Sequence, residues 1–162
     1  MANAKAGETG PKEGEPAPGF DAPTDGGGTV SLDGHAGKPV VLYFYPKDDT
    51  SGCTKEALAF TALADEFRKA GAAVIGVSRD EVAKHDRFKA KHGLDVTLAS
   101  DEDGAITEAY GVWVEKSMYG KTYLGIERAT FLIGPDGQVA KAWRKVKVPG
   151  HAEEVLEAVR NL

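Results

Sequence analysis

The run PVVLYFYPKDDTSGCT, residues 39–54, is the most informative part of the sequence about the fold, because it joins a strand pattern directly to the start of a helix. Its first half is continuous, β-branched and aromatic, and Pro46 ends it, which predicts a buried strand. A helix follows, with Thr50 or Ser51 as its N-cap residue. Its apolar stripe comprises Ala57, Phe60, Leu63, Ala64 and Phe67. Cys53 is therefore expected in the first turn of a helix that follows a buried strand.

Strand and helix patterns alternate through the rest of the chain. We expect a hairpin over 20–32 and strands over 73–77, 96–98, 129–133 and 139–143. Helices are expected from the capping-box pattern Ser78–Glu81 to about His92, from 104 to 110, and at the C-terminus with Val155, Leu156, Val159 and Leu162 on one face. Residues 112–125 are expected to form a long aromatic loop or extended segment. This order predicts an α/β protein with a thioredoxin-like fold. Helices flank a mixed central sheet in that fold, and here a hairpin precedes it.

Composition favours one domain in a chain of 162 residues. Residues 1–18 are expected to form a mobile tail and residues 19–162 the folded domain. The longest apolar run, 40–45, is far shorter than the roughly 20 residues of a membrane span. The start has no apolar core typical of a secretory signal, which favours a cytoplasmic protein. A net charge of −5 argues against nucleic acid as a partner.

One basic cluster, made of Lys141, Arg144, Lys145 and Lys147, stands out against the acidic composition. The cluster falls in or just after a predicted strand near the edge of the sheet, where lysines commonly oppose aggregation. We interpret it as an edge feature.

Cys53 is the only cysteine, so neither an internal disulfide nor a CxxC redox pair can form. A free cysteine is often just a small buried hydrophobic residue. At a helix N-terminus, however, unpaired N–H groups and the helix dipole stabilise a thiolate, lowering a cysteine pKa from about 8.5 to roughly 3.5–7.5. Asp48, Asp49 and Glu56 would oppose this effect, so a fixed cation is expected nearby.

The pattern Pro46-x-x-x-Thr50-x-x-Cys53 resembles the active-site motif of the peroxiredoxins. The fuller run YFYPKDDTSGCTKEA, residues 43–57, is similar to the bacterioferritin-comigratory-protein type, also called the Q type. Further similarity lies in VWVEKSMYGK, residues 112–121, and in GIERATFLI, residues 125–133. The resemblance covers about residues 15–162, which is nearly the whole chain.

The resemblance implies a role for each of four residues. Cys53 would be the peroxidatic cysteine, and Arg128 would be the fixed cation that holds it as a thiolate and polarises the peroxide. Thr50 would orient the substrate oxygens, Pro46 would shield the site from water, and the backbone N–H of Cys53 would complete the cradle. Hydrogen peroxide or an organic hydroperoxide would be reduced to water or an alcohol, leaving a sulfenic acid. No metal, flavin or haem would be needed.

Position 58 departs from the family pattern. Many Q-type proteins carry a resolving cysteine five positions after the peroxidatic one, where this chain has Leu58, which we interpret as natural. The expected cycle therefore uses one cysteine and an external thiol reductant: thioredoxin, glutaredoxin or a small thiol. The resemblance favours a monomer, with a dimer as the alternative.

Two other functions remain open from the sequence. A cysteine-nucleophile hydrolase would need a histidine base within reach of Cys53. A peroxide sensor on the same scaffold would use oxidation of Cys53 as its signal. The four histidines, at positions 35, 85, 92 and 151, are expected to be solvated or on helix surfaces. Trp113, Tyr119 and Tyr123 are expected to pack around the 112–125 segment or to line the substrate entrance.

Overall fold

The computed structural model describes residues 9–162. In chain order the elements are β1 (Asp21–Pro23), η1 (Asp25–Gly27), β2 (Thr29–Ser31), η2 (Asp33–His35), β3 (Val40–Phe44), α1 (Ser51–Ala62), α2 (Ala64–Lys69), β4 (Ala73–Ser78), α3 (Val82–His92), β5 (Thr97–Ser100), α4 (Ala105–Ala109), β6 (Trp113–Met118), β7 (Lys121–Ile126), β8 (Ala129–Ile133), β9 (Val139–Trp143) and α5 (His151–Arg160). The predicted α/β fold with a mixed central sheet is confirmed, as is its N-terminal hairpin, β1–β2.

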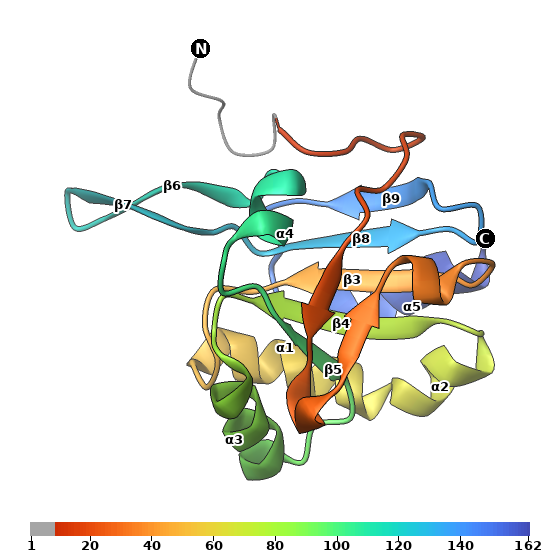
Figure 1. The fold of residues 1–162 in the computed structure, drawn as a ribbon, viewed down its shortest axis with the longest axis horizontal. Coiled ribbons are helices and arrows are strands. Elements are labelled where there is room, and N and C mark those ends of the chain that lie inside the picture. Colours follow the sequence, from red (N-terminus) through yellow and green to blue (C-terminus); the bar gives the residue numbers. More distant parts are fainter. Residues whose placement is uncertain (1–8) are drawn as a thin grey trace.

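The central sheet has five strands in the order β5-β4-β3-β8-β9 (Figure 1). β3 pairs in parallel with β4, and β4 with β5, whereas β8 runs antiparallel to both β3 and β9. The parallel half contains the helical crossovers, as required when neighbouring strands run in the same direction. β3 is therefore the central strand, and its five residues are all buried.

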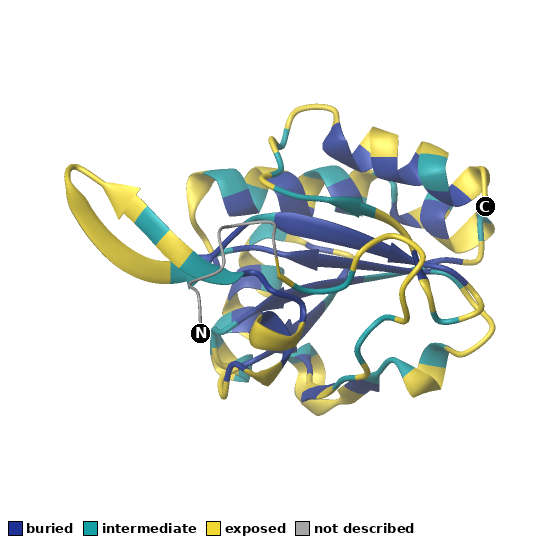
Figure 2. Ribbon diagram, turned by 90° about the horizontal axis from the view of Figure 1, so that it is seen from above, coloured by how far each residue is buried: buried dark blue, intermediate teal, exposed yellow. Residues whose placement is uncertain are grey.

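Alternate side chains of β3 enter two separate cores, because successive residues of a strand face opposite sides of the sheet. Val41 and Tyr43 pack with α1, α2 and α5. Leu42 and Phe44 pack on the other side with the β1–β2 hairpin, α4 and Tyr110. Figure 2 shows the buried strands between these two layers. This double burial explains why residues 40–45 form an unbroken apolar run.

Two helix boundaries differ from the sequence-based expectation. The single helix expected after Cys53 is broken at Leu63, whose ψ of 8° ends α1 before α2 begins. The capping box at Ser78 does not form, because Ser78 belongs to β4 and its hydroxyl donates to Asp80 at 2.7 Å. α3 accordingly begins only at Val82, while its expected end at Gly93 is confirmed by that residue's left-handed conformation.

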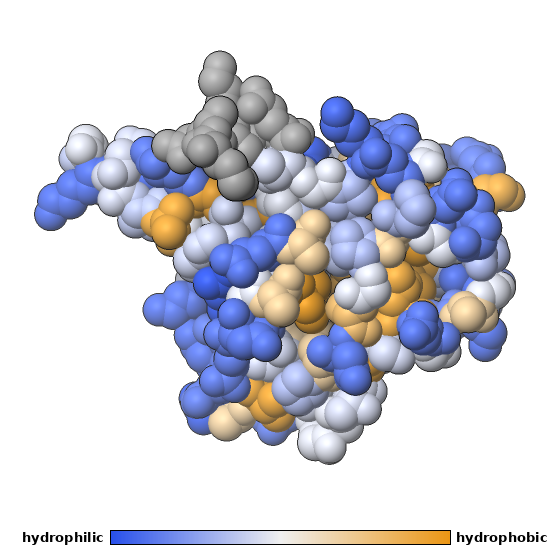
Figure 3. Space-filling view, turned by 45° about the horizontal axis from the view of Figure 1, so that its top comes forward, coloured by the Kyte–Doolittle hydropathy of each residue, from blue (hydrophilic) through white to orange (hydrophobic). Residues whose placement is uncertain are grey.

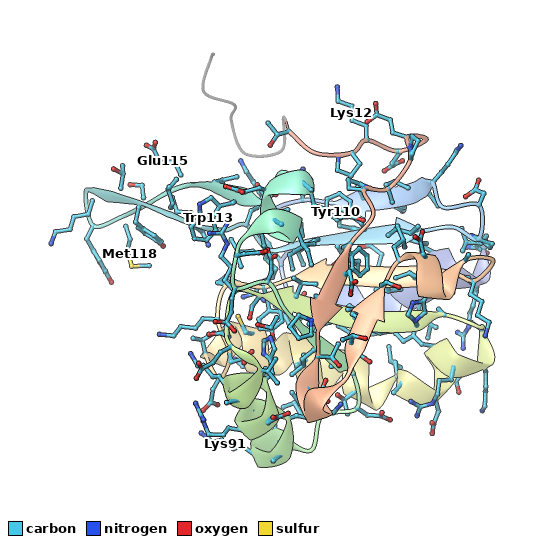
Figure 4. All side chains as sticks on the ribbon, viewed as in Figure 1. Lys12, Lys91, Tyr110, Trp113, Glu115 and Met118 are labelled. Atoms are coloured by element: carbon cyan, nitrogen blue, oxygen red, sulfur yellow. The ribbon has the colours of Figure 1, made fainter. Side chains whose placement is uncertain are left out.

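Residues 113–126 form an antiparallel hairpin of β6 and β7. Of the two structures expected for residues 112–125, a loop or an extended segment, the extended one is therefore present. The hairpin projects from the body of the molecule, and most of its residues are exposed (Figure 2). Glu115 and Met118 extend to opposite sides of it (Figure 4). Tyr119, at the turn, is 96% exposed, and Tyr123 is 44% exposed. Trp113, at the base, stacks beneath the Arg79 guanidinium at 3.4 Å.

The segment expected as a mobile tail divides into two parts. Residues 1–8 lie outside the described residues. Within residues 9–18, Gly14 donates to the carbonyl of Val139 at 2.8 Å, and the Val139 N–H donates to Glu15 at 2.9 Å. These bonds place the segment along β9, an edge strand of the sheet. Because exposed strand edges promote aggregation, the segment protects this one.

Arg144 differs from the edge role expected of the basic cluster. Its guanidinium donates to the Glu127 carboxylate at 2.7 Å and to the carbonyls of Thr9 and Gly111 at 2.9 Å and 2.7 Å. It therefore ties the N-terminal segment to the core, whereas Lys141 on β9 stays exposed.

Hydrophilic side chains cover much of the face seen in Figure 3, and hydrophobic residues lie between them in separate patches. The large hydrophobic residues with the most exposed area include Met118, Tyr119 and Leu124 on the projecting hairpin. None of the helices within residues 9–162 combines the length and the apolar character that crossing a bilayer requires.

Candidate active site

Three chain segments meet at one end of the central sheet. The carboxyl end of β3, the loop that leads into α1 and the link between β7 and β8 lie together there (Figure 1). The antiparallel register explains this meeting, because Phe44 at the end of β3 pairs with Ala129 at the start of β8. Arg128, which directly precedes Ala129, is thereby brought to the first turn of α1.

Cys53 lies in that first turn, and its thiol is next to Arg128. The distance from Arg128 Nη2 to Cys53 Sγ is 3.4 Å, and Cys53 is only 2% exposed. Gly52 permits this approach, because a Cβ at its position would lie 3.2 Å from Nη2. The cation that the acidic neighbourhood of Cys53 required is therefore present, and it comes from a distant part of the chain.

Thr50 and Pro46 lie in the loop between β3 and α1. Thr50 occupies the expected N-cap position, yet its hydroxyl donates to the Lys47 carbonyl at 2.9 Å and caps no helix N–H. The N–H groups of the first turn, including that of Cys53, therefore stay available to a bound group. Pro46 is half-buried and Thr50 is exposed.

A fully buried polar cluster of Tyr45, Asp48 and His85 holds this loop in place. Asp48 accepts the Tyr45 hydroxyl at 2.6 Å and lies 2.6 Å from Nδ1 of His85, and its N–H donates to Asp80. The other ring nitrogen of His85 lies 3.0 Å from the Ala99 carbonyl. The expectation of a surface position for His85 is wrong, because the carboxylate of Asp48 supplies the buried partner that the ring needs.

Asp49 extends the same support toward the surface. Its φ of 60° is left-handed, which non-glycine residues rarely adopt. Its carboxylate accepts Lys91 at 2.7 Å and His92 at 2.8 Å, and these bonds lower its pKa. The loop between β3 and α1 is thus fixed to α3 at two successive residues.

Glu56 belongs to this centre as well, although the sequence analysis assigned it no partner. It is 1% exposed, and its Oε1 accepts Arg128 Nη1 at 2.6 Å. Burial, opposed by Arg128, raises the pKa of Glu56 from 4.5 to about 7. The sequence could have indicated this pair, because Glu56 directly precedes Ala57 on the buried stripe of the helix and a buried carboxylate needs a partner.

Other ionisable groups surround this centre. Burial, together with the nearby Glu56 and Cys53, raises the pKa of Tyr43 well above its usual value. Lys116 donates to the Ile126 carbonyl at 2.8 Å, and burial and Arg128 lower its pKa. Burial alone would lower the pKa of Arg128, but Glu56 and Cys53 raise it instead.

No histidine within residues 9–162 hydrogen-bonds to Cys53. His151 is buried against Thr130, with Nε2 2.8 Å from the hydroxyl, so its expected surface position is also wrong. His35 contacts the Ser31 carbonyl, and His92 contacts Asp49. A cysteine hydrolase therefore lacks its base in this geometry. Within the same residues, no group of three or more His, Cys, Asp or Glu side chains is arranged to hold a metal ion.

A single thiol that faces an arginine at a helix start, in a thioredoxin-like fold, is typical of thiol-based redox proteins. Residues 14–142 match the AhpC/TSA family. The chain is 56% identical to peroxiredoxin Bcp of Xanthomonas campestris pv. campestris over 147 residues, covering 90% of this chain and 92% of that one. It is 46% identical to peroxiredoxin Bcp of Bacillus subtilis, covering 92% and 95%.

Solved structures agree with these relatives. A structure of Xanthomonas campestris peroxiredoxin Q has a TM-score of 0.84 at 55% identity, covering 88% of this chain and 90% of that one. A mutant PrxQ of Xylella fastidiosa has a TM-score of 0.90 at 42% identity, covering 94% and 98%. The chain belongs to the AhpC/TSA family, within its Bcp or Q-type peroxiredoxins.

Proposed function

We propose that this protein is a thiol-dependent peroxidase that reduces hydrogen peroxide and organic hydroperoxides through Cys53. The observation that carries the proposal is the 3.4 Å contact between Arg128 Nη2 and Cys53 Sγ in the first turn of α1. This contact supplies a fixed positive charge to a thiolate that needs one. Organic hydroperoxides are included because a 54% identical relative from Xanthomonas campestris is described as having alkyl peroxide reduction activity.

The geometry supports one role for each group. The Cys53 thiolate attacks the terminal peroxide oxygen, an S–O bond forms, the O–O bond breaks, and sulfenic acid remains while water or an alcohol leaves. Arg128 and the N–H of Cys53 stabilise the negative charge that moves onto the oxygens. Thr50 orients the peroxide with its hydroxyl, and Pro46 limits the access of water.

Regeneration requires a second molecule because Cys53 is the only cysteine. A thiol condenses with the sulfenic acid to give a mixed disulfide and water, and a second thiol releases Cys53. Thioredoxin, glutaredoxin or a small cytoplasmic thiol fits this role. The protein acts as a monomer in this proposal, which size-exclusion chromatography with light scattering tests directly.

Peroxide consumption with dithiothreitol as reductant tests the function. Turnover above the uncatalysed rate is expected for the wild-type protein and is lost in Cys53→Ser. Undiminished turnover in Cys53→Ser would refute the proposal, and so would no turnover in the wild type. A protein that forms the sulfenic acid but does not turn over would be a sensor.

A further inference from the structure

Glu56 is a buried acid with an incomplete set of hydrogen bonds, close to Cys53 on α1. Its Oε1 accepts Arg128 at 2.6 Å, whereas its Oε2 is buried and meets no protein donor among the described residues. Burying a charged oxygen without a donor costs more free energy than burying a neutral one. The position therefore favours the protonated, neutral carboxyl group.

Arg128 faces two acidic groups at once. Its Nη1 donates to Glu56 at 2.6 Å and its Nη2 to Cys53 at 3.4 Å. No other cation within residues 9–162 hydrogen-bonds to either group. If both were charged, one negative charge would lie buried without compensation, which is costly at low dielectric. The site is therefore most stable when it holds one anion and one proton between the two acids.

The neighbouring ionisable groups do not change this balance. Tyr43 on β3 stays neutral because its pKa is raised well above the usual value. Lys116 on β6 gives its hydrogen bond to the Ile126 carbonyl. His151 on α5 contacts Thr130, and burial lowers the pKa of its ring. None of these side chains hydrogen-bonds to Glu56 or Cys53.

We propose that Glu56 stores a proton while Cys53 is a thiolate and releases it when peroxide oxidises Cys53. This inference rests on the proposed peroxidase function. In the step, Cys–S⁻ forms a bond to the terminal oxygen of R–O–OH, the O–O bond breaks, and RO⁻ leaves. The Glu56 proton neutralises RO⁻ as ROH, so the products are neutral Cys–SOH and the Glu56 carboxylate. Sulfur is oxidised and the peroxide is reduced, with no proton taken from solvent.

The change of partner supplies the physical reason for the release. The thiolate and the Glu56 carboxylate compete for one guanidinium, and oxidation replaces the thiolate by a neutral group. Arg128 is then free to stabilise the carboxylate alone, so Glu56 holds its proton less tightly after oxidation than before. Its pKa of about 7 before oxidation keeps the store filled in mildly acidic solution.

Proton uptake during a single oxidation tests the store. Reduced protein, in weak buffer about one pH unit below 7, is mixed with one equivalent of hydrogen peroxide. A pH indicator reports protons taken up, and intact mass with dimedone reports sulfenic acid. Close to no uptake is expected for the wild type and about one proton per sulfenic acid for Glu56→Gln. The ultraviolet absorbance of the thiolate beforehand must show Cys53 ionised, because a protonated thiol would overturn the proposal.

Glu127→Gln is the matched control. Glu127 is a second buried acid that accepts an arginine, Arg144 at 2.7 Å, and leaves Oε1 without a protein donor, but it makes no bond to Cys53. Its variant should take up as few protons as the wild type. Equal uptake in wild type and Glu56→Gln would refute the store. Ionisation of the sulfenic acid cannot explain a higher proton uptake in Glu56→Gln than in the wild type. Removing Glu56 would favour that ionisation, and an ionised sulfenic acid would lower the proton uptake of the variant.

Infrared difference spectra of the wild-type protein give a readout that needs no variant. Oxidation should remove a protonated-carboxyl C=O band and create a carboxylate band, whereas an unchanged carboxyl region would overturn the inference. The two proposals fail differently. Absence of dimedone-reactive sulfenic acid in the wild type refutes the peroxidase, while sulfenic acid formed with full proton uptake refutes only the proton store.

Discussion

Arg128 and Cys53 are separated by 75 positions in the chain, yet the guanidinium of one lies 3.4 Å from the sulfur of the other. The antiparallel pairing of β3 with β8 produces this contact, because it sets the start of β8 against the end of β3. The sheet thus holds the Arg128 guanidinium beside the thiol. A fixed position suits a group that must stabilise a transition state without reorganising.

Replacing Arg128 with Ala should slow formation of the sulfenic acid by about 10²- to 10³-fold, as when one preorganised donor is lost from a reactive site. Alkylation of Cys53 should also require a higher pH, since the thiolate loses its cation. Rapid-quench mass spectrometry and the pH profile of iodoacetamide labelling measure the two effects. Arg128→Lys should recover only part of the rate, because one ammonium cannot contact Cys53 and Glu56 together. A labelling profile equal to the wild type would contradict the role.

Thr50→Val should slow peroxide attack by about 10- to 100-fold, the loss expected for one hydrogen bond to the reacting oxygens. The fold should be unaffected, since the Thr50 hydroxyl binds only the Lys47 carbonyl at an exposed site. Thr50→Ser keeps the hydroxyl and should stay near the wild-type rate. If Thr50→Val reacts as fast as Thr50→Ser, the hydroxyl does not orient the peroxide.

Leu58→Cys should convert the one-cysteine cycle into one with an internal disulfide. Leu58 is 41% exposed and follows Cys53 by five residues on α1, about 7.5 Å along the helix axis. Because a disulfide tolerates at most about 7 Å between Cα atoms, α1 must open locally. One equivalent of peroxide should therefore lower the mass by two hydrogens and reduce the helical circular dichroism. Leu58→Ser should instead give a dimedone adduct, and a dimedone adduct in Leu58→Cys would contradict the prediction.

The Asp48–His85 pair should be worth far more than the exposed Asp49–His92 pair, although both connect the same loop to α3. The first pair is fully buried, so removing one partner in His85→Leu should cost about 3–5 kcal/mol. The second has side chains 38% and 23% exposed, so His92→Leu should cost no more than about 1 kcal/mol. Urea unfolding measures both. Equal losses would show that burial does not decide the strength of these contacts.

The contribution of Glu56 to folding stability should fall as the pH rises from about 4.5 to about 7, because Glu56 keeps its proton in the folded protein over a range where the unfolded chain releases it. The stabilisation is complete below the unfolded pKa of 4.5 and is lost as the pH rises through the folded pKa of about 7. The loss amounts to at most about 3 kcal/mol at 1.36 kcal/mol per pH unit. The urea midpoint should change less with pH over this range in Glu56→Gln than in the wild type. The exposed control Glu108→Gln should keep the pH dependence of the wild type. Parallel profiles would contradict the raised pKa.

Local patterns were enough to predict most of the secondary structure. Strands at 129–133 and 139–143 match β8 and β9 residue for residue, because the strand-forming residues and the turn between them are local features of the sequence. Ser78 shows the limit of such patterns. It lies in a capping-box pattern, but it is the last residue of β4, and α3 begins only at Val82.

Residues 39–54 are enough to predict a lone thiol at a helix start after a buried strand, since both features follow from local patterns. Resemblance to a family pointed to Arg128. The contacts of Arg128 with both Cys53 and Glu56, and the burial of His85 with Asp48, became visible in the three-dimensional fold. Each of these contacts joins side chains that are far apart in the chain and gives a buried polar group its partner. They form only because the sheet brings distant segments together.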